Sequence, residues 1–166
     1  MKRIIQLIID FLNKLLGYND NYTNTSTNIN IYNYQEKQFM SNYERYFFNI
    51  LMELEKELSI RIHPQVNLNS IINKIDNTKY RNELFRNIDF AIFDNNYTKV
   101  LLLIEINDNT HNTKSRRIRD QKVDKICAKA KIKLIKFYSK YANEKSYVKN
   151  RIKQELTKTE NQIEKQ

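Results

Sequence analysis

Two strongly apolar segments joined by a short polar turn constrain the fold of this chain more than any other feature. The segments are IDFAIFD (88–94) and KVLLLIEIN (99–107), and the tetrapeptide NNYT (95–98) separates them. Short apolar runs that are rich in Ile, Leu and Phe and bounded by turn residues are typical of buried β-strands. The short connection therefore predicts that the two segments form a β-hairpin.

The other elements are predicted to extend this hairpin into a larger sheet covered by helices. Ser41 and Glu44 form a capping box, so a helix is predicted from here to about Leu58. An alternating, β-prone segment follows at 60–68. Three elements are predicted after the hairpin: a helix at 115–129, a strand at 132–138 and a helix at 143–156. The predicted fold class is therefore α/β, an α+β mixed sheet with the order α-β-β-β-α-β-α.

The first 16 residues, MKRIIQLIIDFLNKLL, have the pattern of a separate N-terminal amphipathic helix. Its polar groups argue against a membrane-spanning helix, and two arrangements stay open. The helix either makes a peripheral contact with a membrane surface or packs against protein. Residues 17–37 are predicted to be a low-complexity Asn/Thr/Tyr linker, residues 38–158 the folded domain and residues 159–166 a disordered tail.

Composition excludes several classes of protein. The chain has 166 residues with one glycine and one proline, which excludes Gly-rich phosphate loops and dinucleotide-binding fingerprints. Cys127 is the only cysteine, which excludes a disulfide framework, and its helical spacing predicts a small core residue. No apolar run reaches the roughly 18 residues that span a bilayer. We therefore expect a cytoplasmic protein that is at most peripheral to a membrane.

Positive charge is concentrated in the C-terminal third of the chain. The formal net charge is +10, and residues 112–166 hold 17 basic and 6 acidic residues. Four cations gather near the start of the helix predicted at 115–129, and three of them are Arg, which pairs bidentately with phosphate: Lys114, Arg116, Arg117 and Arg119. This asymmetry favours nucleic acid as the partner, with a solvated Lys-rich helix as the alternative. Tyr138 and Tyr141 are candidates for stacking on bases.

Two acids lie within the apolar hairpin. If the turn is centred on Tyr97, Asp89 and Glu105 are cross-strand partners whose Cβ atoms lie about 5 Å apart. Carboxylates this close repel each other, so one becomes neutral unless a divalent cation lies between them. Such a cation supports hydrolysis of phosphodiesters. A shift of the hairpin register by one residue would instead send the two acids to opposite faces of the sheet.

An ordered set of residues resembles the PD-(D/E)XK, or restriction-endonuclease-like, superfamily. The set comprises Glu44, HPQV (63–66), IDF (88–90) with Asp94, IEINDNTHN (104–112), Arg116 with RDQKVDK (119–125), and LIKF (134–137). Within the superfamily, the chain resembles a small domain family akin to the very-short-patch-repair endonuclease branch. The resemblance covers about residues 38–140 and implies a nuclease-like domain that cleaves DNA with Mg²⁺ or Mn²⁺.

The resemblance implies roles for particular residues. Asp89 and Glu105 would bind the metal ion, and His111 and Lys122 would assist catalysis. The residues with a supporting role would be Glu44, Gln65, Asn107, Asp120 and Lys125.

Two positions depart from the family pattern. Asn107 stands where the superfamily has its motif lysine, so the task of that lysine would fall to Lys122 or Lys125. Lys131 stands where the family tends to have a glycine, which predicts a small strain cost. We therefore expect a metal-dependent nuclease-like domain acting on DNA. The alternative is a catalytically inactive nucleic-acid-binding module of the same fold. A third interpretation is that the N-terminal helix places the domain on a membrane.

Overall fold

The structure is a computed structural model that describes residues 34–75, 82–107 and 114–163. The chain divides into two compact units, residues 1–37 and residues 38–166. The amphipathic helix predicted at 1–16 and most of the predicted linker lie outside the described residues. The helices and strands below all belong to the second unit.

Four strands form one mixed sheet in the order β1-β2-β3-β4. The strands are β1 (Ile60–Asn67), β2 (Asn87–Asp94), β3 (Val100–Asn107) and β4 (Leu134–Tyr138). β2 pairs antiparallel with both β1 and β3, whereas β4 pairs parallel with β3. The predicted hairpin and the predicted mixed sheet are therefore confirmed.

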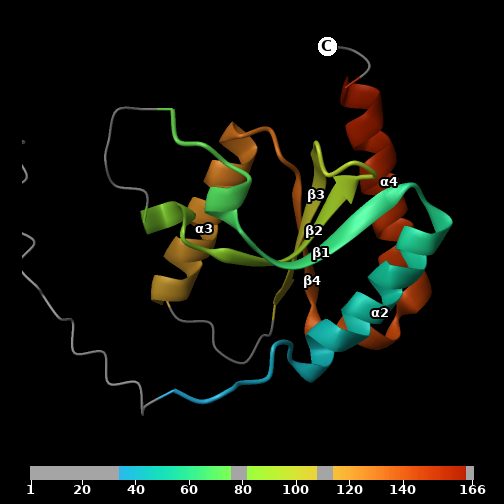
Figure 1. The fold of residues 1–166 in the computed structure, drawn as a ribbon, viewed down its shortest axis with the longest axis horizontal. Coiled ribbons are helices and arrows are strands. Elements are labelled where there is room, and N and C mark those ends of the chain that lie inside the picture. Colours follow the sequence, from blue (N-terminus) through green and yellow to red (C-terminus); the bar gives the residue numbers. More distant parts are fainter. Residues whose placement is uncertain (1–33, 76–81, 108–113, 164–166) are drawn as a thin grey trace, which may run out of the picture. The chain divides into compact units, whose positions relative to one another are not determined.

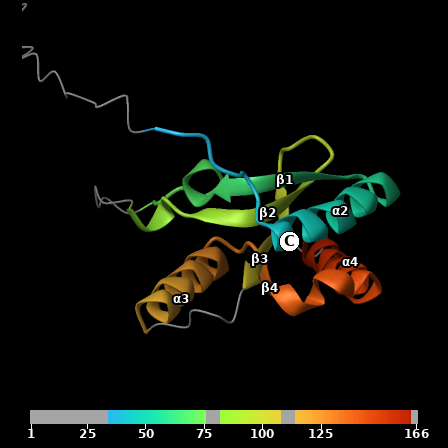
Figure 2. The same cartoon turned by 90° about the horizontal axis from the view of Figure 1, so that it is seen from below.

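Three helices cover the two faces of this sheet. They are α2 (Asn42–Glu57), α3 (Lys114–Lys129) and α4 (Lys145–Ile163). Figures 1 and 2 show α3 on one face and both α2 and α4 on the other. The mixed α+β class is confirmed. None of the helices in the described segments is long and apolar enough to cross a membrane.

The start of α2 follows directly from its capping box. The Ser41 hydroxyl accepts a hydrogen bond from the Glu44 amide at 3.2 Å, and Glu44 Oε2 accepts one from the Ser41 amide at 2.6 Å. The helix then buries an apolar stripe against the sheet: Phe47, Ile50, Leu51 and Leu54. The start predicted from the sequence is confirmed.

The sheet separates two apolar cores. One lies between the sheet and the α2–α4 layer and includes Phe47, Phe90 and Phe137, all essentially inaccessible to solvent. The other lies between the sheet and α3 and includes Val123 and Cys127. Cys127 is therefore the buried core residue that its spacing predicted. Because α3 buries little apolar surface, most of its length faces solvent.

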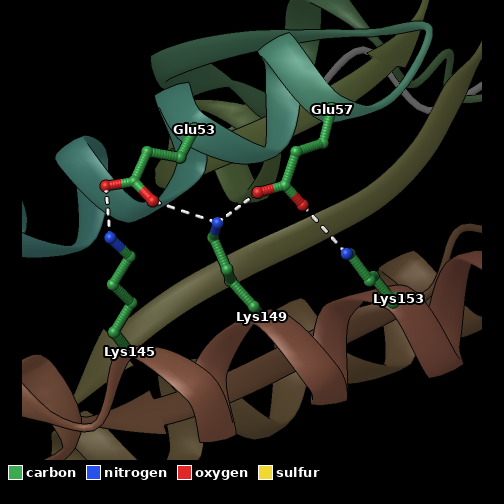
Figure 3. Close-up of polar contacts among 5 residues, drawn as sticks. All are labelled: Glu53, Glu57, Lys145, Lys149 and Lys153. Atoms are coloured by element: carbon green, nitrogen blue, oxygen red, sulfur yellow. Dashed lines mark hydrogen bonds and ion pairs between the residues drawn. The ribbon is translucent and has the colours of Figure 1, made fainter.

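A row of ion pairs joins α2 to α4 (Figure 3). Glu53 accepts from Lys145 at 2.6 Å and from Lys149 at 3.0 Å, and Glu57 accepts from Lys149 and, at 2.9 Å, from Lys153. Hydrogen bonds from these lysines lower the pKa of Glu57 to about 2 and also lower that of Glu53. We call these five residues the α2–α4 ladder.

The C-terminal elements differ from the predictions at the end of α4 and agree with them at Lys131. α4 continues to Ile163, so residues 159–163 are helical rather than part of a tail, because no glycine or proline interrupts the sequence TENQI. Lys131 has φ 58°, the left-handed conformation that ends α3, and the Ile132 amide donates to the Cys127 carbonyl at 2.9 Å. The strain expected at Lys131 is therefore present in the backbone.

Candidate functional site

The hairpin register brings the two acids of the sequence together. Phe90 pairs with Ile104, and continuing this register by one residue places Asp89 opposite Glu105. The Ile106 amide donates to Asp89 Oδ2 at 2.6 Å, which fixes the Asp89 carboxyl beside β3. This register is the predicted one.

A β-bulge is needed to reach that register. Near the turn, Phe93 pairs with Val100, whereas Ile92 pairs with Leu102, so Leu101 is an extra residue on β3. If the pairing at the turn continued without this bulge, Asp89 would lie opposite Ile104. Glu105 would then project from the other face of the sheet. The bulge at Leu101 therefore determines that Asp89 and Glu105 lie opposite each other on the same face of the sheet.

The outer strands extend the pair into a row that crosses the whole sheet. The β1–β2 register places Gln65 opposite Asp89, and Glu105 pairs directly with Lys136 of β4. We call Gln65, Asp89, Glu105 and Lys136 the polar row. It combines an amide, two carboxyl groups and an ammonium group, one from each strand.

Burial dominates the electrostatics of Asp89. The pKa of Asp89 is raised to about 7, chiefly by burial, and the hydrogen bond from the Ile106 amide opposes that rise. Repulsion from the carboxylates of Glu44 and Glu105 contributes to the rise. Asp89 is therefore protonated in a large fraction of molecules near neutral pH, as expected of a carboxyl group that shares a buried site with another.

Glu105 lies among charges of both signs. Burial raises its pKa, and the neighbouring Lys136 ammonium is the largest opposing influence. Asp120 and Asp124 of α3 raise the pKa of Glu105, whereas Arg86, just before β2, lowers it. The site is thus a concentration of acids balanced in part by two cations.

Glu44 and Gln65 lie next to Asp89 on the side away from Glu105. Gln65 Nε2 donates to Glu44 Oε1 at 2.9 Å, while Glu44 Oε2 remains in the capping box of α2. Gln65 has φ 53°, a left-handed conformation that is costly for a residue with a Cβ atom. The two residues therefore join the start of α2 to β1 next to Asp89, and the supporting role predicted for them stays a prediction.

Lys122 and Lys125 are exposed on α3, whereas Lys136, which was not predicted, lies next to Glu105. α3 turns Asp120, Val123 and Cys127 toward the sheet, so Lys122 and Lys125 fall on exposed sides of the helix. Lys136 instead lies next to Glu105, with Nζ 2.6 Å from Asp124 Oδ1. Sequence reasoning missed Lys136 because it depends on the parallel pairing of β3 with β4, which no local pattern reveals.

The remaining predicted site residues are distributed as follows. Asn107 ends β3 and is half-buried. Lys114, Arg117 and Arg119 are exposed on the first turns of α3, and the side chain of Arg116 is not described. His111 lies outside the described residues. The basic start of α3 is therefore available to a partner, and its relation to His111 stays a prediction.

The acids of the polar row provide some, but not all, of the ligands of a hard cation. Among the residues with described positions, no group of three or more His, Cys, Asp or Glu side chains is arranged to hold a metal ion. Asp89 and Glu105 nevertheless supply two neighbouring carboxyl groups, and Mg²⁺ is commonly held by one or two carboxylates together with water and substrate phosphate. The residues present fit such an ion.

A large hollow of about 800 Å³ lies elsewhere, between the β2–β3 turn and the α3–β4 turn. It is lined by Tyr97, Lys99 and Lys131 among others, and neither Asp89 nor Glu105 lines it. It lies at the N-terminal ends of the parallel strands, where ligands are seldom bound in open α/β sheets. The polar row, at the opposite ends of these strands, is therefore the better candidate site.

Comparison with known proteins places the chain in a family without assigning an activity. Residues 36–158, which contain the whole sheet, match the family described as "Protein of unknown function (DUF2726)". The chain belongs to this family. The DUF2726 match includes every residue of the polar row. Nothing among curated proteins or solved structures matches the chain.

Proposed function

We propose that residues 38–158 form a metal-dependent nuclease-like domain that hydrolyses phosphodiester bonds of DNA. We further propose that its fold is of the restriction-endonuclease-like, PD-(D/E)XK type. The observation that carries the proposal is the polar row, in which Asp89 and Glu105 lie side by side on neighbouring strands. Paired carboxyl groups of this kind are costly to a fold, and perturbed pKa values are a feature of functional sites.

Asp89 and Glu105 would hold Mg²⁺ or Mn²⁺. A bound divalent cation supplies a lowered pKa for an attacking water and polarisation of a phosphoryl oxygen. Binding of the cation would also remove the repulsion between the two carboxylates, since it favours their ionised forms. Glu44 and Gln65 would keep Asp89 in place from the opposite side.

Lys136 would take over the task of the motif lysine, which Asn107 cannot perform because an amide carries no charge. The ammonium group of Lys136 is beside Glu105 and half-buried, with 27% of the side chain exposed. From this position it would keep Glu105 ionised and donate a hydrogen bond to an attacking water or to a phosphate oxygen. In this proposal Lys136 replaces Lys122 in the catalytic set.

Substrate binding is proposed to involve the basic start of α3. Lys114 and Arg117 are three residues apart, so they share a helical face, and both are exposed. Exposed Arg and Lys side chains bind phosphate without reading sequence and make the affinity strongly dependent on salt.

The proposal is tested by incubating the purified chain with single-stranded and double-stranded DNA in Mg²⁺ or Mn²⁺. E105Q is expected to lose cleavage, and K136M is expected to lose cleavage while still binding DNA. K122A and E55Q serve as matched controls, since Lys122 is exposed on α3 and Glu55 pairs with Arg61 away from the polar row. Cleavage that persists in E105Q would refute the assignment of the site.

Asn107 favours a second candidate, a nucleic-acid-binding module of the same fold that does not cleave. This alternative predicts binding that weakens as salt is raised and that is reduced by combining K114A with R117A. It also predicts no cleavage with any divalent cation. Cleavage by the wild-type chain that E105Q abolishes decides for the nuclease.

A further inference from the structure

Three tyrosines form a continuous aromatic surface after β4. Tyr138 ends β4, Tyr141 lies in the short 3-10 helix Ser139–Asn143, and Tyr147 lies in the first turns of α4. The ring centroids of Tyr138 and Tyr141 are 6.4 Å apart, and those of Tyr141 and Tyr147 are 4.8 Å apart. We call Tyr138, Tyr141 and Tyr147 the tyrosine shelf.

The shelf is open to solvent although its rings are large. Tyr138 is 44% exposed and Tyr147 is 40% exposed. Tyr147 is held in place by an edge contact with the buried Phe137 ring and by a hydrogen bond that Arg151 donates to its hydroxyl at 3.3 Å. The exposed tyrosine rings are therefore supported from below by Phe137, which is part of the buried core.

The shelf begins where the candidate site ends. Tyr138 pairs directly with Asn107 on β3, two residues beyond the pairing of Glu105 with Lys136. Both pairs lie at the C-terminal ends of parallel strands, the edge at which open α/β sheets bind ligands. A nucleic-acid strand bound at the polar row can thus continue onto the tyrosine shelf without leaving this edge of the sheet.

An exposed cation, Lys140, lies beside the shelf. Lys140 Nζ lies 4.9 Å from the centre of the Tyr141 ring, and Lys140 is exposed. Among the ion pairs between described residues, no carboxylate is recorded as a partner of Lys140. Exposed aromatic rings with an unpaired cation beside them are the combination that binds single strands, since the rings stack on bases and the cation binds phosphate.

We propose that the tyrosine shelf binds the unpaired bases of a single-stranded nucleic acid. The inference rests on the proposed function in one respect, since it identifies the substrate class of the polar row as a single strand or an unpaired end. The interior base pairs of a duplex cannot use the shelf, because their faces are already stacked on one another.

The test measures binding by fluorescence anisotropy in EDTA, so that cleavage plays no part. The probes are fluorescein-labelled oligo(dT) and oligo(U) of about 12 nucleotides, a typical length for single-strand sites, and a duplex of the same length. Y138A is expected to weaken binding of the single strands about 5- to 100-fold, whereas Y138F and Y138W retain it. K140A is expected to reduce the salt dependence by about one phosphate contact.

Tyr97 provides the matched control, because it is 53% exposed but lies in the β2–β3 turn at the other end of the sheet. Y97A should bind the single strands like the wild type, and thermal unfolding should show that Y138A folds normally. Equal binding of single strands by Y138A and the wild type would overturn the proposal, as would an equal loss on the duplex.

The two proposals fail separately. If single-strand binding depends on Tyr138 but the protein cleaves no DNA, the proposal for the tyrosine shelf is supported and the nuclease proposal is refuted. Cleavage of single strands by Y138A with wild-type affinity and rate would remove the shelf and keep the nuclease.

Discussion

Replacing Asp89 by Asn is expected to stabilise the domain at neutral and higher pH. The folded-state pKa of Asp89 is about 7, against an ordinary value of 3.8, so ionising this group in the folded protein costs about three pKa units. At 1.36 kcal/mol per unit, this corresponds to about 4 kcal/mol. Asparagine is neutral at every pH and its oxygen can still accept from the Ile106 amide.

The direction of the pH dependence follows from the raised pKa. The folded state binds the Asp89 proton more tightly than the unfolded state. The stabilisation from this proton is therefore fully present below pH 3.8 and is lost as the pH rises through 7. The wild type should lose stability between these values through Asp89, whereas D89N should not.

The assay is urea unfolding in EDTA at pH 5 and pH 8 for the wild type, D89N and the control E55Q. At pH 8, D89N is expected to be more stable than the wild type by about 2–4 kcal/mol, and the difference should shrink at pH 5. E55Q should not alter the pH dependence, since Glu55 makes an ion pair of 3.6 Å with the partly exposed Arg61. A gain that is absent at pH 8, or equal at both pH values, would show that Asp89 is not destabilised by its surroundings.

Three further outcomes are expected. E57Q should lower the urea midpoint at pH 7 and flatten the loss of stability as the pH falls from 4.5 toward 2. The reason is that the lowered pKa of Glu57 gives stability that is present above its ordinary pKa and is lost in acid. Circular dichroism measured against pH checks this, and an unchanged acid transition would contradict it. K131G should stabilise the domain by about 0.5–1 kcal/mol in urea unfolding, since glycine removes the cost of φ 58° but increases the entropy of the unfolded chain. Burial raises the pKa of Cys127 to about 11, so its reaction with a thiol reagent at pH 8 should require unfolding and follow the urea transition; rapid reaction in the native state would refute its burial.

Local patterns were sufficient to predict the elements of the fold. The capping box at Ser41 and Glu44 placed the start of α2, and the apolar segments on both sides of residues 95–98 placed β2 and β3. The end of α4 was placed too early, because weak amphipathicity near its C-terminus does not reveal whether a helix stops.

The candidate site was only partly predictable, because it depends on long-range pairing. Asp89 and Glu105 could be paired by assuming a hairpin symmetric about Tyr97, yet that register is reached through the bulge at Leu101. The contribution of Lys136 depends on the parallel addition of β4, and the left-handed Gln65 has no sequence signal. The position of Lys136 and the conformation of Gln65 both depend on pairing between strands, whereas hydrophobic periodicity indicates only which side of an element is buried.

The polar row takes one residue from each of the four strands, and this has a consequence for assembly. Cutting the chain between β3 and α3 would leave Gln65, Asp89 and Glu105 on one fragment and Lys136 on the other. Neither fragment would hold all four residues of the polar row. Re-association of the two would restore it through β3–β4 pairing, the α2–α4 ladder and the core that the fragments share. The domain could therefore serve as a split reporter, in which recovery of the ammonium beside Glu105 signals that two tethered partners have met.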